Sequence, residues 1–264
     1  MVDAVLILTG AALLAVVLLA LSHAALGRPT RRRIAAAACV ALVGSLVIAW
    51  RISKSTSFQL IGEPITRVAT SSRVVALTFD DGPDPRYLDG ILDTLRAANV
   101  HATFFAIGDE LEQHPELGPK IVAAGHELGN HSFTHPRMVL RSLAFMRDEI
   151  QRTDDAIRRA GYGGAIQFRP PNGKRLLGLP WVLRELGRSA VLWDVAPDSE
   201  DPSTSAAQIV ERVRAEVQPG SIVLMHLMGS QRGTSRAALP QVIHELAEQG
   251  YRFVTVSELL SLRP

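Results

Sequence analysis

The chain has 264 residues, of which 47% are hydrophobic, and its formal net charge is +2 with a pI near 9.0. The positive charge comes from scattered arginines and one N-terminal cluster, and no basic stretch interleaved with aromatic residues follows residue 60. Nucleic acid is therefore not an expected partner. The single cysteine, Cys39, excludes an intramolecular disulfide and leaves the redox compartment open.

Residues 1–52 are predicted to be a membrane anchor with two transmembrane helices. Residues 2–26 form an almost unbroken apolar run, and residues 34–50 form a second, shorter one. A membrane-spanning helix needs about 20 such residues. Four arginines lie in the connection 27–33, which the positive-inside tendency places in the cytoplasm. The expected location is the cell membrane, with membrane lipid as a partner and the C-terminal part on the periplasmic or extracellular side.

Two other interpretations of this N-terminus stay open. A cleaved secretory signal would need a basic stretch before a shorter apolar core, and residues 1–3 carry no positive charge. A later translation start would make residues 31–33 the basic stretch and residues 34–50 the apolar core. Either alternative still delivers the C-terminal part to the outside.

Residues 53–72 are rich in serine and threonine and are predicted to be a linker, followed by a catalytic domain at 73–264. In that domain strand-like apolar runs alternate with helical patterns, which favours an α/β fold. About seven parallel strands are expected, at 74–79, 102–107, 127–130, 167–169, 190–193, 221–226 and 252–256. Helices are expected at 87–98, 115–124, 142–160, 179–186, 205–217, 236–249 and 257–262. The alternating charges at 147–159 are predicted to form a solvated helix face.

Polar motifs follow one predicted strand after another. In a (β/α) barrel the carboxyl ends of the strands share one face, where active sites gather. A small or incomplete barrel is therefore preferred to a doubly wound sheet, and neither a glycine-rich phosphate loop nor a Gly-x-Ser-x-Gly elbow is present. The residues that follow the strands are Asp80 and Asp81, His131, Arg169, Asp194 and Asp198, and His226.

The residue types at this face suggest a metal-dependent hydrolase. Asp80 and Asp81 close the first strand, and His131 and His135 follow about fifty residues later. One carboxylate and two imidazoles suit a borderline Lewis acid such as zinc and leave a coordination position open. The second carboxylate can take a proton from water that the cation acidifies. A Gly-Pro turn after the aspartates is expected to end the strand and bring both carboxylates into one loop mouth.

Four segments occur in a characteristic order: Thr78–Pro83, His131-x-x-x-His135, Arg169–Gly173 and Leu224–His226. Together they resemble the polysaccharide deacetylases, also called the NodB-homology or carbohydrate esterase family 4 domain, over residues 73–262. The resemblance implies a deformed (β/α)7–8 barrel and a divalent metal, usually Zn²⁺, with Co²⁺, Mn²⁺ or Ni²⁺ as alternatives. It implies removal of acetyl groups from an acetylated glycan partner, such as peptidoglycan or a chitin-like polysaccharide.

The resemblance also assigns roles around the metal. Asp81, His131 and His135 are the expected ligands, and the spacing of the two histidines is compatible with one helical turn. Asp80 is the expected general base. Arg169 is expected to pair with Asp80 and favour its ionised form.

Further roles follow for the substrate side of the site. Pro171, Asn172 and Leu224 are the expected substrate-binding residues, with the backbone N–H of Asn172 holding the oxyanion and Leu224 lining the pocket for the acetyl methyl group. His226 is expected to protonate the leaving amine.

Two departures from the family pattern affect these expectations. Many members have an aromatic residue where Asn172 stands, which puts substrate choice in doubt. Many also have an Asp-Trp pair after the fifth strand that orients the acid histidine, and the tryptophan is absent here. Asp198 is the preferred partner that raises the pKa of His226, with Asp194 as the second choice.

Two other functions stay open. Related domains hydrolyse formamides or cyclic amides, and deformylation of a lipid-linked amino sugar would suit a membrane-anchored enzyme. Release of formate in place of acetate would distinguish this case. A noncatalytic glycan-binding module is the alternative from another class, motivated by the missing Asp-Trp pair. The intact aspartates and histidines of the four segments speak against it.

Overall fold

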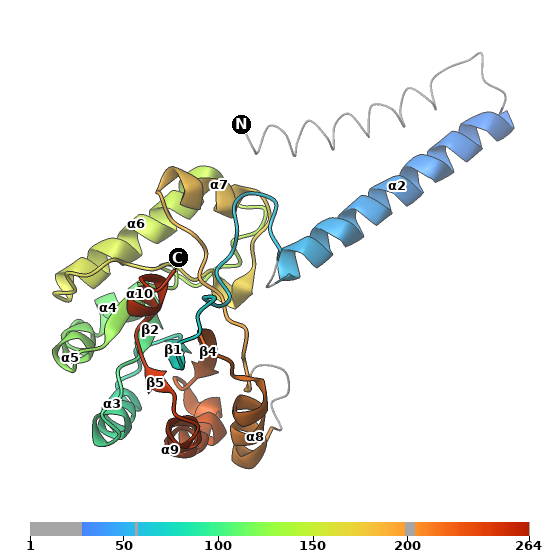
Figure 1. Ribbon diagram of the computed structural model, residues 1–264. Coiled ribbons are helices and arrows are strands. Elements are labelled where there is room, and N and C mark those ends of the chain that lie inside the picture. The colour runs from blue at the N-terminus through green and yellow to red at the C-terminus, as the bar shows by residue number, and fades with distance from the viewer. Residues whose placement is uncertain (1–27, 56–57, 199–203, 264) are drawn as a thin grey trace.

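The computed structural model describes residues 28–55, 58–198 and 204–263 (Figure 1). The apolar run expected as a helix at 2–26 lies outside these residues. The second run forms part of helix α2 (Arg28–Lys54), which projects from the domain. Its segment Arg32–Ser53 is long and apolar enough to cross a membrane, and its most apolar window is not buried inside the protein. The described residues thus contain one of the two expected apolar helices.

A five-stranded sheet forms the centre of the domain, and all its ladders are parallel, as expected. The strand order is β3-β2-β1-β4, and β5 also pairs with β1. The strands are β1 (Val74–Asp80), β2 (Thr103–Ala106), β3 (Glu127–Asn130), β4 (Ser221–His226) and β5 (Arg252–Phe253).

Single bridges, rather than further strands, complete the ring between β3 and β4. Phe168 bridges both Asn130 and Ala190, and Val195 bridges Val223 on β4. The strands expected at 167–169 and 190–193 are therefore isolated bridges in the described chain, and the expected number of regular strands was too high. The result is a deformed barrel with one regular parallel side.

A buried side chain explains part of this irregularity. The guanidinium of Arg169 donates from Nε to the carbonyl oxygen of Val191 at 3.3 Å and from Nη2 to that of Leu192 at 2.9 Å. These carbonyls accept hydrogen bonds from a side chain where a regular ladder would use backbone N–H groups.

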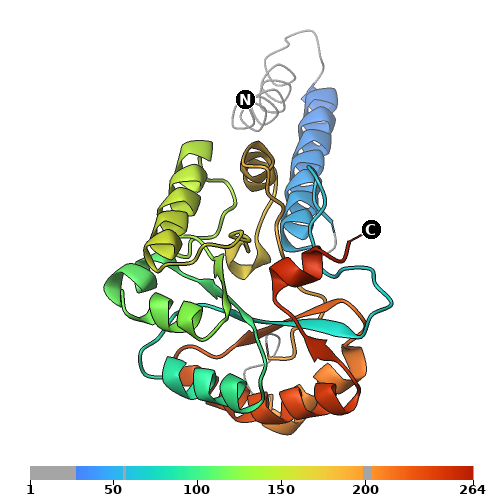
Figure 2. The ribbon, with the colours of Figure 1, turned by 60° about the vertical axis from the view of Figure 1, so that its left-hand side comes forward.

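Helices surround the barrel, and most begin and end within three residues of the expected positions. The helix expected at 115–124 is shorter, and a further short helix that the sequence did not reveal precedes it. The helices are α3 (Leu88–Ala97), α4 (Gly108–Gln113), α5 (Leu117–Ala123), α6 (Leu143–Arg159), α7 (Gly178–Glu185), α8 (Ala206–Glu216), α9 (Gly233–Glu248) and α10 (Val256–Leu260). Figure 2 shows α3, α8 and α9 on one side of the sheet and α2, α6 and α7 extending from the other.

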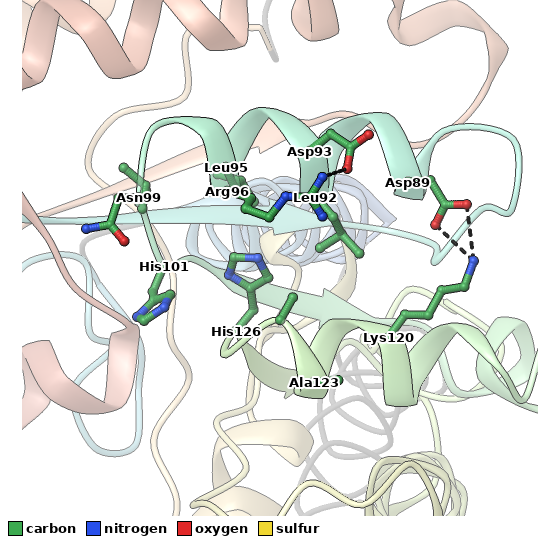
Figure 3. Close-up of a pocket in the computed structure, with 12 residues that line it drawn as sticks. Asp89, Leu92, Asp93, Leu95, Arg96, Asn99, His101, Lys120, Ala123 and His126 are labelled. Atoms are coloured by element: carbon green, nitrogen blue, oxygen red, sulfur yellow. Dashed lines mark hydrogen bonds and ion pairs between the residues drawn. The ribbon is translucent and has the colours of Figure 1, made fainter.

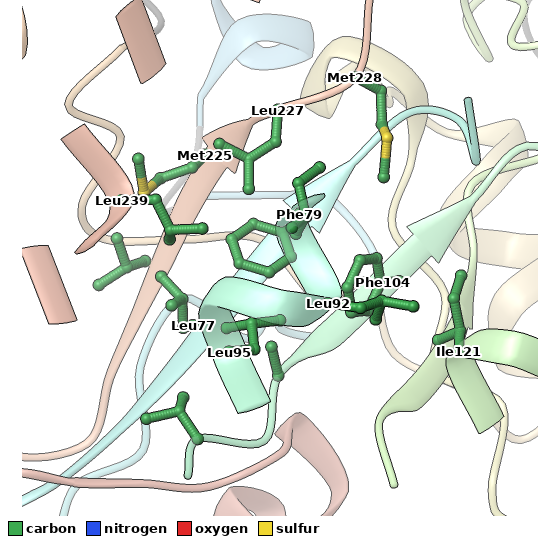
Figure 4. Close-up of a cluster of buried hydrophobic side chains, with 14 of the residues drawn as sticks. Leu77, Phe79, Leu92, Leu95, Phe104, Ile121, Met225, Leu227, Met228 and Leu239 are labelled. Carbon is green, nitrogen blue, oxygen red and sulfur yellow. The ribbon is translucent and has the colours of Figure 1, made fainter. Parts of the chain in front are cut away.

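The main core lies between the sheet and the helices on its outer side (Figure 4). Leu77 and Phe79 of β1 point into it, and Phe79 meets Phe104 edge to face at 5.1 Å between ring centroids. Because successive strand residues face opposite sides, Thr78 and Asp80 point to the interior of the barrel. The outer core therefore determines which side chains of β1 reach the site.

Part of the segment expected to be a linker packs against the domain. Ile65 and Val68 are buried in a second apolar cluster with the inner residues of the sheet. Ile65 bridges Val191, and the N–H of Val68 donates to the carbonyl oxygen of Gly220 at 3.0 Å. These two apolar residues complete the inner cluster, so the packed domain extends N-terminal of the expected start at residue 73.

Candidate active site

The end of β1 brings two carboxylates into one region, as the turn after them led us to expect. Asp80 is the last residue of the strand, and Asp81 leaves it with a left-handed φ of 73°. Gly82 follows with φ of 69°, and a Cβ there would lie 2.6 Å from Cγ of Met228, so the close approach at this turn requires glycine. The strand therefore ends abruptly, with Asp80 buried and Asp81 partly exposed.

His131 and His135 lie in a loop after β3 and not on the helical turn with which their spacing is compatible. Ser132 and His135 have left-handed φ values of 66° and 55°, and this backbone brings the two imidazole centroids to 5.0 Å. The loop is held by Glu149 of α6, whose carboxylate accepts hydrogen bonds from the N–H groups of Phe133 and Thr134 at 2.9 and 2.8 Å. It also accepts one from the hydroxyl of Thr134 at 2.8 Å.

Glu149 is a site-supporting residue that the sequence analysis missed, because it belongs to the charged run expected to be solvated. The structure buries Glu149 and Asp154 of that run. Asp154 accepts a hydrogen bond from Nδ2 of Asn130 at 2.8 Å. The helical periodicity of the sequence could have indicated that Glu149 is buried, because Glu149 lies three residues after the apolar Met146 and next to the apolar Ile150, on the inner side of α6.

Asp81, His131 and His135 form a potential metal-binding group. Their ligand atoms all lie within 4.8 Å of one another. Nε2 of His135 is 3.4 Å, and Nε2 of His131 3.9 Å, from Oδ1 of Asp81. Nδ1 of His131 lies 2.8 Å from the carbonyl oxygen of Arg169 and donates to it, which leaves the lone pair on Nε2 for a cation.

This donor set fits a divalent metal. Two imidazole nitrogens and one carboxylate oxygen are the donors that zinc takes in catalytic sites. Burial, and then the neighbouring His131, lower the pKa of His135, so its ring is neutral and able to ligate at neutral pH. The side chains of Asp81 and His135 are 32% and 33% exposed, so the group opens to solvent.

Asp80 is held by a fully buried arginine. Nη1 of Arg169 lies 2.6 Å from Oδ1 of Asp80 and 2.8 Å from the hydroxyl oxygen of Thr78, and its guanidinium lies 4.0 Å from the Phe105 ring centroid. Burial alone would raise the pKa of Asp80, but Arg169, and then His131 and His226, lower it below its ordinary value. Asp80 is therefore an ionised carboxylate, with Oδ2 3.6 Å from Nε2 of His131.

His226 stands opposite Asp80 in the β1–β4 register and faces the same interior. Oδ1 of Asp198 lies 3.2 Å from its Nδ1, and Oδ2 accepts a hydrogen bond from its backbone N–H at 2.7 Å. Burial alone would lower the pKa of His226, but the bond to Asp198, together with the charge of Asp80, raises it. Asp194 instead accepts hydrogen bonds from Ser221 and Ile222 at the start of β4.

The remaining expected residues lie on two elements. Leu224 is buried and, two residues before His226 on β4, faces the same side of the strand. Pro171 is buried and Asn172 is exposed in the 3₁₀ turn Pro171–Gly173, where Asn172 has a left-handed φ of 55°. Trp193 borders this turn, since a Cβ on Gly173 would lie 3.1 Å from its ring.

A cavity of about 690 Å³ lies elsewhere, between α3 and α5 (Figure 3). His101 and His126 line it and precede β2 and β3, so it lies at the opposite end of the strands from the metal-binding group. Nδ1 of His126 accepts a hydrogen bond from the N–H of Ala102 at 3.2 Å. Burial lowers the pKa of His126 to about 4, so it is a neutral, structural histidine.

Comparisons with known proteins identify relatives of this chain. A family model described as polysaccharide deacetylase matches residues 67–191. A peptidoglycan-N-acetylglucosamine deacetylase of Bacillus cereus is 37% identical over 194 residues, covering 73% of this chain and 91% of that protein. The peptidoglycan-N-acetylmuramic acid deacetylase PdaC of Bacillus subtilis is 36% identical over 194 residues, 73% of this chain but 40% of that longer protein.

Solved structures show the same relationship. A peptidoglycan N-acetylglucosamine deacetylase aligns with a TM-score of 0.69 and 34% identity over 74% of this chain and 92% of that chain. A CE4 family pseudoenzyme from Bacillus anthracis aligns with a TM-score of 0.68 and 32% identity over 76% of this chain and 70% of that chain. With the fold, the four sequence segments and these relatives in agreement, the chain belongs to the polysaccharide deacetylase family, carbohydrate esterase family 4.

Proposed function

We propose that this protein hydrolyses the acetamide group of N-acetylated sugars in peptidoglycan. One observation carries the proposal: an ionised carboxylate, Asp80, and a histidine with a raised pKa, His226, face each other across the register of β1 and β4 beside a two-imidazole, one-carboxylate group. Amide hydrolysis needs a base for water and an acid for the leaving amine, and this pair supplies both.

Asp81, His131 and His135 would hold the divalent metal, with Zn²⁺ as the preferred ion. Such a cation polarises a carbonyl oxygen and makes water more acidic. Asp81 supplies the negative charge among the ligands. The bond from Nδ1 of His131 to the carbonyl of Arg169 fixes the orientation of that ring, and Glu149 fixes the loop that carries both histidines.

The other residues of the site then each contribute to one step of the reaction. Asp80 takes a proton from the attacking water, because its pairing with Arg169 keeps it ionised. The backbone N–H of Asn172 stabilises the negative charge on the carbonyl oxygen. His226, held by Asp198, gives a proton to the nitrogen as the carbon–nitrogen bond breaks, so the products are acetate and a free amine. Leu224 and Pro171 border the acyl group.

Location narrows the substrate class. We infer that Arg32–Ser53 of α2 crosses the cell membrane and that the barrel lies outside, where peptidoglycan is accessible. Relatives named as deacetylases of the N-acetylglucosamine and N-acetylmuramic acid of peptidoglycan support this substrate class.

The test is acetate release by the full chain in detergent, measured on N-acetylglucosamine oligomers and on peptidoglycan together with bound metal. Asp80→Asn should keep the metal and lose acetate release by about 10²–10⁴-fold, whereas His135→Ala should lose both. His244→Ala, an exposed histidine on α9, is the matched control and should change neither.

The other outcomes separate the alternatives. Formate release from formylated amino sugars, without acetate release, would favour the amide-hydrolase alternative. Bound metal without turnover on any acylated glycan would favour a pseudoenzyme, a class that occurs among the structural neighbours. Absence of bound metal in the wild-type protein would refute the proposed mechanism.

A further inference from the structure

The C-terminal end of α2 contacts the loop at residues 171–175, which carries Asn172 and is called the Asn172 loop below. The ammonium of Lys174 lies 5.3 Å from the ring centroid of Trp50, in the last part of α2. The backbone N–H of Arg175 donates to the carbonyl oxygen of Ser53, one residue before the helix ends, at 3.4 Å. In Figures 1 and 2, α2 runs outward from this point of contact with the domain.

One buried side chain connects the Asn172 loop with Phe58 and Gln59, which follow α2 in the chain. The guanidinium of Arg175 donates from Nη1 to the carbonyl oxygen of Gly173 at 3.1 Å, within the Asn172 loop. It also donates from Nε to Oε1 of Gln59 at 2.8 Å and from Nη2 to the carbonyl oxygen of Phe58 at 3.3 Å. Arg175 is 1% exposed. Burial lowers its pKa to about 10, so it keeps its charge and its donors at neutral pH.

The Asn172 loop needs such support. Asn172 and Gly173 are both left-handed, with φ of 55° and 63°, a region that glycine adopts freely and that asparagine adopts at a small cost. Trp193 lies beside Gly173, and Arg175 donates a hydrogen bond to the carbonyl oxygen of Gly173. The direction of the Asn172 N–H therefore depends on contacts that reach into the chain just after α2.

We propose that Ser53, Phe58, Gln59 and Arg175 form a clamp that orients the Asn172 N–H for catalysis, which makes the end of the membrane anchor a part of the active-site frame. This inference rests on the proposed deacetylase function. Arg175 acts as a positioning residue through the Asn172 loop. Gln59 supplies a side-chain acceptor for Arg175 in the clamp.

The kinetic test uses the full chain in lipid nanodiscs and a soluble N-acetylglucosamine tetramer as substrate. Arg175→Gln should lower kcat by about 10- to 100-fold, the effect of a displaced oxyanion donor, with KM and bound metal nearly unchanged. Arg175→Lys keeps the charge without the planar fork and should recover little. Gln59→Ala should act in the same direction, and the double variant should be no worse than Arg175→Gln alone.

Hydrogen exchange gives a readout that does not depend on activity. Arg175→Gln should speed exchange at amides 172–176 and 58–60 and leave the sheet protected, whereas the control Arg184→Gln, an exposed arginine on α7, should change neither exchange nor kcat. Unchanged kcat in Arg175→Gln would overturn the clamp, as would a loss of kcat that comes with metal loss or faster exchange throughout the domain. If the wild-type protein releases no acetate, the proposed function fails, and exchange at amides 172–176 decides the clamp by itself.

Discussion

Replacing Asp198 by asparagine isolates the contribution of one carboxylate to the acid histidine. Asp198 lies 3.2 Å from Nδ1 of His226 and raises its pKa against the lowering effect of burial. Asparagine keeps the shape of the side chain and removes the charge. The pKa of His226 should therefore fall, and the protonated acid should be lost at a lower pH.

The size of the effect follows from the contact. The side chains of His226 and Asp198 are 18% and 2% exposed, so solvent screens the pair little. A hydrogen bond to a charged group contributes about 1.5–3 kcal/mol, and each 1.36 kcal/mol is about a tenfold change. At pH values above the basic limb of the wild-type pH profile, kcat/KM of Asp198→Asn should be about 10- to 100-fold lower than that of the wild type. At pH values near the acid limb, the variant and the wild type should have similar kcat/KM.

The assay is the pH dependence of kcat/KM for acetate release from N-acetylglucosamine oligomers. Its matched control is Asp194→Asn. Asp194 lies in the same segment as Asp198, just before the Val195–Val223 bridge, but it accepts hydrogen bonds from Ser221 and Ile222. A basic limb that stays in place in Asp198→Asn, or moves equally in Asp194→Asn, would refute the assignment of Asp198 to His226.

Three further predictions concern buried titratable side chains. Arg169→Met leaves the carboxylate of Asp80 buried and without its ion-pair partner, so the free energy of unfolding measured with urea should be about 3–5 kcal/mol lower. Adding Asp80→Asn should recover part of that loss, and purely additive losses in the two variants would contradict the pairing. Glu149→Ala removes the acceptor that holds the histidine loop, so titration with Zn²⁺ should give a Kd about 10- to 100-fold higher, whereas the exposed Asp148→Ala should match the wild type. Because burial lowers the pKa of His126 from 6.5 to about 4, the unfolded chain binds more protons in this window, and Tm should fall as pH falls through it; an equal fall in His126→Gln would show that another group is responsible.

Local patterns were sufficient for much of the fold. The strands at 127–130 and 221–226 have the bounds expected from their apolar runs, and α6 starts after Ser142, whose side chain accepts a hydrogen bond from the N–H of Phe145. α4 was missed because only six residues separate Ile107 from His114, and its position depends on packing rather than on its own pattern. Gly108, for example, lies so close to α6 that a Cβ there would be 2.7 Å from the hydroxyl of Thr153.

The geometry of the site could be predicted less well from local sequence patterns. An i, i+4 pair of histidines reads as a helical turn, and what excludes the helix is the acceptor Glu149, on another element. The support of the Asn172 loop by Phe58 and Gln59 joins residues more than a hundred positions apart, which no single sequence pattern records. The choice between Asp194 and Asp198 likewise depends on register, because Asp194 meets the start of β4 and Asp198 its end.

The contact between Trp50 and Lys174 has a consequence for where the protein can work. If α2 crosses the membrane as proposed, Trp50 lies near the interface that aromatic side chains prefer, and the Asn172 loop lies beside it. A short, rigid attachment limits the volume that a tethered site can search, whereas a long flexible one enlarges it. The protein would then encounter glycan strands as these leave the lipid bilayer. Older strands in outer layers of the wall would lie beyond its reach, however tightly the site could bind them.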